Sequence, residues 1–144
     1  MESTILNDRY RIVELVGTGG MATVYVATDL RLERRVALKV MHGHLSDDQV
    51  FQGRFIEEAR AAARLADPHV VNVFDQGQDG EMAYLVMEYL PGITLRDLLR
   101  EQRRLSIPQT ITIMDAVLSG LAAAHRAGIV HRDVSPENVM VAEE

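Results

Sequence analysis

The stretch that decides the fold reads HRDVSPEN, from His131 to Asn138, and it follows directly on the apolar residues after Gly128. Asp133 offers a carboxylate that can accept a proton from a hydroxyl group. Asn138 follows five residues later, and its carbonyl oxygen is a ligand that Mg²⁺ accepts. A proton acceptor and a metal ligand at this spacing predict chemistry on a hydroxyl group beside a metal ion, whereas the alternative is a plain polar loop.

A glycine-rich stretch, GTGGMATV, lies near the other end of the chain. Gly17, Gly19 and Gly20 have no Cβ, so backbone N–H groups can approach a phosphate closely there. The stretch is not a dinucleotide-binding fingerprint, because a strand pattern rather than a helix follows it from Thr23. It also lacks the Gly-Lys-Ser/Thr of a Walker loop. Taken alone, it is equally compatible with a simple hairpin.

A lysine lies within the apolar strand pattern VALKV. Side chains alternate along a strand, so Val36, Leu38 and Val40 share one face and Ala37 and Lys39 share the other. Lysine is rarely buried without a partner, so the ordinary interpretation of Lys39 is a solvated strand residue.

A predicted helix offers Lys39 a partner. Ser46 and Gln49 have the spacing of a capping box, and the helical pattern continues to about Leu65. Its apolar stripe contains one carboxylate, in the series Phe51, Phe55, Glu58, Ala62 and Leu65. A charge on such a face is costly unless it is paired. A Lys39–Glu58 pair would satisfy both residues and aim the ammonium group at a phosphate, and the alternative is a glutamate at the solvated edge of the stripe.

The remaining pattern predicts an α+β fold. An antiparallel sheet of five short strands is expected, and the turn between the last two contains Gly77 and Gly80. The strands are Tyr10 to Val16, Thr23 to Thr28, Val36 to Val40, Val70 to Phe74 and Ala83 to Glu88.

Two helices are predicted after the sheet. Thr94 opens the first; Ser106 opens the second, with Pro108 in its first turn and Gln109 at the capping-box position, and Gly128 ends it. We therefore expect a strand-rich domain over residues 1–88, a hinge over 89–93 and a helical part over 94–144.

Composition excludes several classes of function. The 144 residues include 21 acids and 15 bases, a net charge of −6, with no dense basic block, so a nucleotide is a better candidate ligand than a nucleic acid. No cysteine is present, which excludes disulfides and thiolate sites. The N-terminus does not resemble a signal peptide, and the uninterrupted apolar stretches are too short to cross a membrane, so we expect this part to be cytoplasmic.

The sequence contains two further clusters of polar residues, one of histidines and one of arginines. His42 and His44 lack a convergent third ligand and are better explained as loop residues than as a metal site. A basic patch is expected to be a solvated helix face, with a docking surface as the alternative, and its members are Arg96, Arg100, Arg103 and Arg104.

Taken together, these motifs resemble those of protein kinases, and in particular bacterial serine/threonine kinases of the PASTA-receptor type common in actinobacteria. The resemblance extends from about Tyr10 to Val141. The closer likeness is carried by Gly19-Gly20-Met21, Arg31-Leu32, Arg54-Phe55, Glu58-Ala59, Met87-Glu88-Tyr89 and Thr94-Leu95-Arg96-Asp97. It implies a kinase N-lobe, with its five-stranded sheet and αC helix, followed by the start of the helical C-lobe.

The resemblance also implies roles for individual residues. Gly17, Gly19 and Gly20 would cover the phosphates of ATP, Lys39 would hold its α- and β-phosphates, and Glu58 would position Lys39. The adenine pocket would be lined by Val16, Val24, Ala37 and Met140, with Met87 as gatekeeper and backbone hydrogen bonds from Glu88 and Leu90. Asp133 would be the catalytic base, Asn138 a ligand of Mg²⁺, and His131 a structural residue of the catalytic loop.

The sequence departs from the kinase pattern in three places. Ala22 replaces the third glycine, which the fold tolerates. Ser135 replaces a lysine that usually contacts the transferred phosphate, and losing that cation is expected to cost roughly 10²–10³ in rate, by analogy with one oxyanion-hole donor. The sequence contains no Asp-Phe-Gly segment or activation loop, so we expect this chain alone to be inactive and one apolar helix face to be bare and prone to self-association.

The resemblance implies an enzyme that transfers the γ-phosphate of ATP to serine and threonine hydroxyls of proteins, including its own. Two alternatives remain: a nucleotide-binding pseudokinase, which Ser135 favours, and a regulatory interaction module. No nucleic-acid partner is expected, and a membrane would be reached only through parts of the protein outside this chain.

Overall fold

The structure is a computed structural model that describes residues 4–18, 22–42, 49–128 and 139–142. Within α2 the side chains at positions 49, 51, 52, 54 and 58 lie outside the described residues, as does the side chain at position 142. The chain divides into two compact units, which are described separately. The first comprises residues 1–64 and 71–89, and the second comprises residues 65–70 and 90–144.

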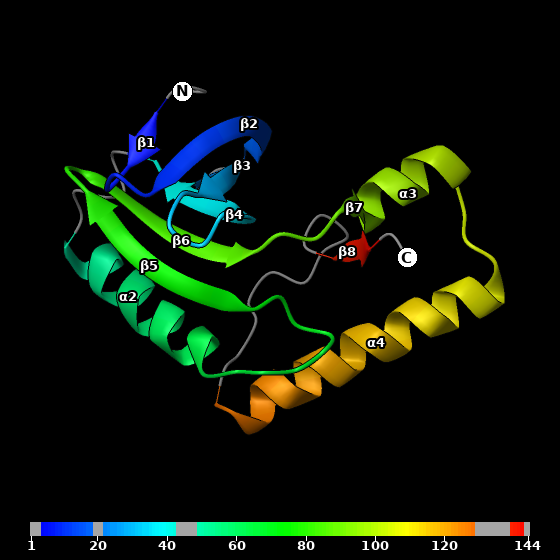
Figure 1. The fold of residues 1–144 in the computed structure, drawn as a ribbon. Helices are drawn as coiled ribbons and strands as arrows, with labels where there is room; N and C mark the ends of the chain where they lie inside the picture. Colours follow the sequence, from blue (N-terminus) through cyan, green and yellow to red (C-terminus); the bar gives the residue numbers. More distant parts are fainter. Residues whose placement is uncertain (1–3, 19–21, 43–48, 129–138, 143–144) are drawn as a thin grey trace. The chain divides into compact units, whose positions relative to one another are not determined.

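The first unit is an antiparallel sheet of six strands in the order β1-β2-β3-β4-β6-β5, with helix α2 lying along β5 (Figure 1). The bounds of its elements are β1 (Ile5–Leu6), β2 (Tyr10–Thr18), β3 (Ala22–Asp29), β4 (Arg34–Met41), α2 (Gln49–Ala63), β5 (Val73–Asp79) and β6 (Met82–Glu88).

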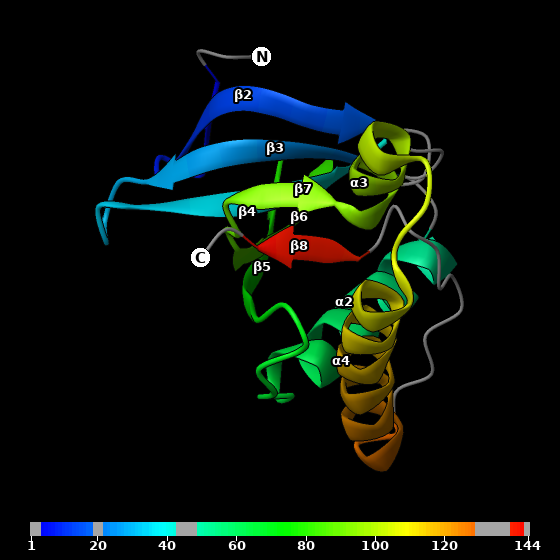
Figure 2. The ribbon, with the colours of Figure 1, turned by 90° about the vertical axis from the view of Figure 1, so that its right-hand side faces the viewer.

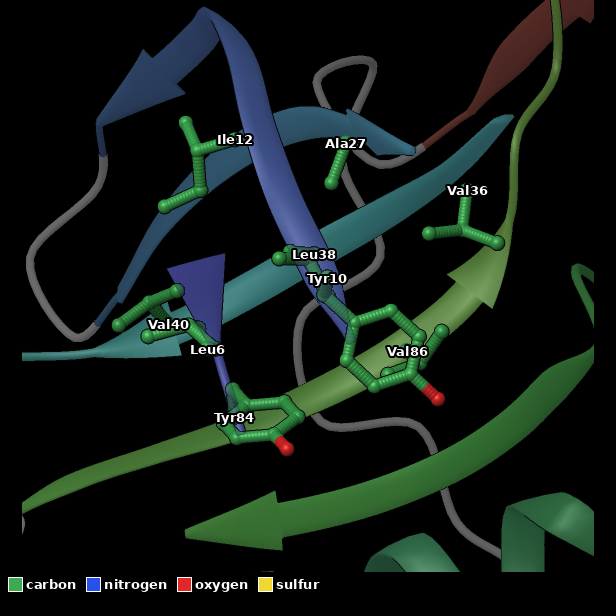
Figure 3. Packing of buried hydrophobic residues seen from close by; sticks show 9 residues of the cluster. All are labelled: Leu6, Tyr10, Ile12, Ala27, Val36, Leu38, Val40, Tyr84 and Val86. Carbon is green, nitrogen blue, oxygen red and sulfur yellow. The ribbon is translucent and has the colours of Figure 1, made fainter. Parts of the chain in front are cut away.

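The core of this unit covers one face of the sheet. It collects alternate residues from β2, β4 and β6, together with Ala27 from β3 and Leu6 from the short strand β1 (Figure 3). In β4 the side chains of Val36, Leu38 and Val40 are 0%, 0% and 5% exposed, as the alternating pattern predicted. The nine members are Leu6, Tyr10, Ile12, Ala27, Val36, Leu38, Val40, Tyr84 and Val86.

All five predicted strands are present, but the strand count and one turn were wrong. The sheet has a sixth strand, β1, whose two residues are too short for any periodic signal. Gly77 lies inside β5 rather than in the turn, because it is paired with Tyr84 and a Cβ there would lie 2.5 Å from the tyrosine oxygen. Only Gly80, with φ of +61°, is in the turn.

Two predicted boundaries were also wrong. β5 begins at Val73 rather than Val70. Helix α2 ends at Ala63 and does not reach Leu65. Residues 65–70 belong to the second unit. Ser46, the predicted capping residue, lies outside the described residues.

The second unit contains a two-stranded sheet, β7 (Gly92–Thr94) with β8 (Met140–Ala142), and two helices, α3 (Leu95–Gln102) and α4 (Ile107–Arg126); the two strands lie side by side in Figure 2. Both predicted helix starts are confirmed, because Thr94 and Ser106 each form a complete capping box. Gly128, with φ of +83°, follows the end of α4 as expected. The small sheet was not predicted, since its strands are three residues long and distant in sequence.

Helix α4 packs one side against residues 65–70. Gly120 allows this approach, because a Cβ at that position would lie 2.9 Å from the carbonyl oxygen of His69. Along another side Ile107, Ile111, Met114 and Leu118 are exposed, which confirms the predicted bare face. Among the described residues, α4 is the one helix with the length and apolar composition to cross a membrane. That criterion is met equally by core helices.

Candidate functional site

The site in the first unit is built around Lys39 on β4. Because Leu38 and Val40 point into the core, Lys39 and Ala37 lie on the opposite face of the sheet. The side chain of Lys39 is exposed, and it forms no ion pair with any residue that the structure describes. The sequence predicted this division of β4 between two faces, and the structure confirms it.

Strand register places apolar side chains around Lys39. Residues directly opposite each other in an antiparallel ladder project to the same face. Lys39 is opposite Val24 of β3 and Leu85 of β6, and Ala37 is opposite Met87 of β6. Three predicted adenine-pocket residues, Val24, Ala37 and Met87, therefore share one face of the sheet with the predicted phosphate-binding lysine.

Two further residues on this face were not predicted. Leu85 is opposite Lys39, and Val26 is opposite Ala37. The position of Leu85 depends on β4 pairing with β6, strands that are separated by helix α2 and strand β5 in the sequence. No local pattern reveals that pairing. Val26 follows Val24 by two residues, so strand alternation alone could have placed it on this face.

The glycine-rich stretch connects β2 and β3. Gly17 is opposite Val24, and the register shifts between Leu15 and Gly17, so Val16 lies in an irregular step of the ladder and is 59% exposed. A Cβ at Gly17 would have no neighbour within 4 Å, so packing among the described residues does not require glycine there. Gly19 and Gly20 lie outside the described residues.

Helix α2 carries the predicted partner of Lys39. The backbone at Glu58 is helical, but its side chain lies outside the described part of the chain, so the ion pair stays a prediction. Among the side chains of this helix that the structure describes, Ala59 is buried, 3% exposed, whereas Phe55 and Ala62 are half-buried. Ala59 does not belong to the predicted stripe, but it lies one helical turn from both Phe55 and Ala62, which do.

The end of β6 contains the predicted adenine-binding backbone. The N–H of Glu88 donates to the carbonyl oxygen of Asn72 at 2.8 Å, and the N–H of Asn72 donates to Oε1 of Glu88 at 3.1 Å. The N–H of Glu88 is therefore engaged within the protein, which leaves the carbonyl as the group to test for a ligand contact. Leu90 is half-buried and belongs to the second unit.

The second unit carries the remaining predicted residues. Met140 is on β8 and is 38% exposed. The N–H of Leu95, the first residue of α3, donates to the carbonyl oxygen of Val139 at 2.7 Å. The start of α3 is thus attached to the residue that follows Asn138. Asp133, Asn138, His131 and Ser135 lie outside the described residues.

Metal-binding side chains are not clustered in the part of the chain that the structure describes. That part contains no cluster of three or more His, Asp or Glu side chains that could hold a metal ion. The predicted ligand of Mg²⁺, Asn138, lies outside it.

Comparisons with known proteins show which sequences and structures this chain is similar to. A family model described as "Protein kinase domain" matches residues 10–144. The serine/threonine-protein kinase PknL of Mycobacterium tuberculosis is 47% identical over 144 residues, which are all of this chain and 36% of PknL. The probable serine/threonine-protein kinase pknA2 of Bifidobacterium longum is 46% identical over 140 residues, 95% of this chain and 18% of that protein.

A solved structure is similar over nearly the whole chain. The crystal structure of the M. tuberculosis PknI kinase domain matches with a TM-score of 0.86 at 30% identity, covering 99% of this chain and 58% of that one. The chain thus spans about a third of the length of PknL and somewhat more than half of the PknI kinase domain.

Proposed function

This chain belongs to the protein kinase domain family, and from that premise we propose that it is the ATP-binding part of a bacterial enzyme that phosphorylates serine and threonine residues of proteins. The observation that carries the proposal is the face of the sheet on which Lys39 projects among Val24, Ala37 and Met87. Apolar side chains beside one exposed cation suit a ligand with an aromatic base and a polyphosphate.

The residues on this face fit ATP chemically. Lys39 has no ion-pair partner among the described residues, so its ammonium group is available to phosphate oxygens. Ala37 is small enough to leave room for a flat base, and Val24 offers it an apolar surface. Met87, opposite Ala37, would limit how deep the base enters, and Val16 and Met140 would complete the adenine pocket. The carbonyl of Glu88 and the backbone of Leu90 would bind the adenine edge.

The glycines of the glycine-rich stretch would let the phosphates of ATP approach the backbone. Packing does not explain Gly17, and glycine in a strand costs conformational entropy, so its value lies in letting a ligand approach the backbone. Gly19 and Gly20 would extend the same cover. Glu58 would pair with Lys39 and hold its ammonium group toward the α- and β-phosphates.

The proposed chemistry is assigned to the segment around Asp133. The carboxylate of Asp133 would accept the proton of the substrate hydroxyl group as that oxygen attacks the γ-phosphate. Asn138 would be a ligand of Mg²⁺, which when bound neutralises negative charge on the phosphates. These assignments rest on the family motif.

A second function, that of a pseudokinase, is favoured by one residue. Ser135 removes a cation that kinases usually place beside the transferred phosphate. A protein of this kind would bind ATP through the Lys39 face and signal through its shape or its partners. An interaction module without nucleotide binding is the third alternative.

Location and partners follow from the same proposal. The kinase part would act in the cytoplasm on protein substrates and on itself, and any attachment to a membrane would lie in other parts of the protein. We also propose that copies of this 144-residue chain associate through the exposed stripe of α4, whose members Ile107, Ile111, Met114 and Leu118 recur at steps of four, three and four.

The deciding experiment follows labelled γ-phosphate from Mg–ATP to a generic basic protein and to the protein itself, with the chain extended through a complete kinase domain. Label on serine or threonine that disappears in Lys39→Met establishes the enzyme. ATP binding without transfer supports the pseudokinase, and Ser135→Lys then tests whether the missing cation is the cause. If the protein shows neither ATP binding nor phosphate transfer, the interaction module is the alternative that remains.

A further inference from the structure

The carboxylate of Glu88 takes the place of a backbone carbonyl where strands β5 and β6 meet. Val73 is opposite Met87, so Asn72 and Glu88 are the next pair in the same register. In a hydrogen-bonded antiparallel pair, each residue donates its N–H to the carbonyl oxygen of the other. Here the N–H of Glu88 donates to the carbonyl oxygen of Asn72 at 2.8 Å, but the N–H of Asn72 donates to Oε1 of Glu88 at 3.1 Å. A side-chain oxygen thus replaces one of the two backbone acceptors.

This replacement releases the carbonyl of Glu88 from the described part of the ladder. The N–H and the C=O of one strand residue face the same neighbouring strand. Because the N–H of Glu88 faces Asn72, the carbonyl of Glu88 does not pair with β4 on the other side of β6. The donor that a regular ladder would offer to this carbonyl, the N–H of Asn72, is held by the carboxylate. Strand β6 ends at Glu88, so a backbone acceptor is left available at the end of the strand.

The side chain of Glu88 lies on the other face of the sheet from the proposed nucleotide site. Side chains alternate along a strand, and those of directly opposite residues share a face. Met87 is opposite Ala37 and shares the face of Lys39. Glu88 is opposite Val36, which is 0% exposed on the core face. The carboxylate therefore affects a nucleotide through the backbone and not through direct contact.

We propose that Glu88 is a positioning residue for the adenine base: its carboxylate holds the N–H of Asn72, so that its own backbone carbonyl stays an acceptor for the exocyclic amine of ATP. This inference rests on the proposed function and deepens it, because it names a source of selectivity for the base. An amine at this place donates to the carbonyl, whereas a base with an oxygen there would place two acceptors against each other.

The test compares ATP with purine riboside triphosphate, in which a hydrogen atom replaces the amino group of adenine. Titration calorimetry on the chain extended through a complete kinase domain measures both dissociation constants. We expect the unchanged protein to bind ATP about fivefold more tightly than the analogue, the effect of one ordinary hydrogen bond. In Glu88→Ala the N–H of Asn72 can turn to the carbonyl of residue 88. The preference for ATP should then fall below about twofold, with the affinity for the analogue unchanged.

Three further variants separate positioning from folding. Glu88→Gln keeps an oxygen acceptor at the same place and should retain the preference for ATP. Glu81→Ala removes an exposed carboxylate from the turn between β5 and β6 and should also retain it. Glu88→Met fills a similar volume without an acceptor, and it replaces the alanine variant if urea unfolding shows that Glu88→Ala does not fold.

The outcomes distinguish the inference from the proposed function. The inference is overturned if the preference for ATP survives in Glu88→Ala, or if that variant weakens both nucleotides equally. Equal affinity of the unchanged protein for ATP and the analogue would overturn it as well. Each of these results leaves the proposed function standing, because ATP still binds. If neither nucleotide binds to the unchanged protein, the proposed ATP site is wrong, and the inference fails with it.

Discussion

The guanidinium group of Arg9 holds the buried carboxylate of Asp29 with two hydrogen bonds, from Nε at 3.0 Å and from Nη2 at 2.9 Å. The side chain of Asp29 is 2% exposed. The same carboxylate accepts the backbone N–H groups of Arg31 at 3.0 Å and Leu32 at 3.2 Å. The side chain of Asp29 therefore connects the residue before β2 to the turn between β3 and β4. Lys39 lies on β4.

Removing the cation should destabilise the fold. Arg9→Ala leaves the Asp29 carboxylate buried with only backbone donors, and we expect the free energy of unfolding to fall measurably. Urea unfolding followed by circular dichroism measures the change. Arg11→Ala is the matched control, because Arg11 is an exposed arginine two residues further along, on β2, and should change stability by less than about 0.5 kcal/mol. Equal losses in both variants would contradict the role of the pair.

The same pair predicts an acid dependence. The hydrogen bonds from Arg9 and the two backbone N–H groups lower the pKa of Asp29 from 3.8 to about 2. A carboxylate with a depressed pKa in the folded state contributes stability above its unfolded pKa and loses it as pH falls toward the folded value. Stability should therefore decline between about pH 4 and pH 2, and less steeply in Asp29→Asn. Parallel declines in the two proteins would show that other groups cause it.

Gly77 should not tolerate a side chain. An added Cβ would lie 2.5 Å from Oη and 2.7 Å from Cζ of Tyr84, a ring that is 2% exposed and whose Oη is hydrogen-bonded to Asn7. Gly77→Ala is expected to cost about 1–3 kcal/mol, and the cost should shrink when Tyr84→Leu is made in the same chain. Gly53→Ala is the control. A Cβ there has no neighbour within 4 Å among the described residues, and alanine should stabilise helix α2 by up to about 1 kcal/mol.

Gly120 should behave in the same way in the second unit. Alanine favours a helix, yet its Cβ would lie 2.9 Å from the carbonyl oxygen of His69 and 3.2 Å from a methyl group of Val70. We expect Gly120→Ala to lower the thermal midpoint by several degrees, the shift that a loss of about 1 kcal/mol produces. A rise in the midpoint would mean that residues 65–70 do not pack against α4 in solution.

Lys39 should matter for ATP and not for folding. Its side chain is exposed, so Lys39→Met should leave the urea midpoint almost unchanged. Losing a charged contact to phosphate should weaken ATP binding by about 10- to 150-fold, which titration calorimetry measures. The neighbouring Leu38→Ala removes a side chain that is 0% exposed and should cost about 2–5 kcal/mol of stability. Unchanged ATP affinity in Lys39→Met would argue against the proposed site.

Local patterns explain what the sequence could predict of the fold. The two capping boxes, at Thr94 and Ser106, each lie within four residues, and the alternation of β4 spans five, so both are visible without knowledge of the rest of the chain. Strands β1, β7 and β8 were missed because two or three residues carry no period. Gly77 was predicted in the turn, but it lies in β5, where the side chain of Tyr84 on β6 leaves no room for a Cβ. A contact with another strand is not visible in the local sequence.

The candidate site likewise has features that the sequence alone predicts and features that only the tertiary structure shows. From sequence alone, alternation determines that Lys39 and Ala37 share a face and that Val36, Leu38 and Val40 share the other, because that rule concerns neighbouring residues of one strand. Only the tertiary structure decides that Val24, Leu85 and Met87 lie on the same face as Lys39 and Ala37, because strand register is set by pairing between distant segments. The side chain of Glu58 and the segment around Asp133 lie outside the described residues, so their proposed roles rest on the sequence. The face to which a strand residue points is determined by a few adjacent residues, whereas the pairing of distant strands depends on how the whole core packs.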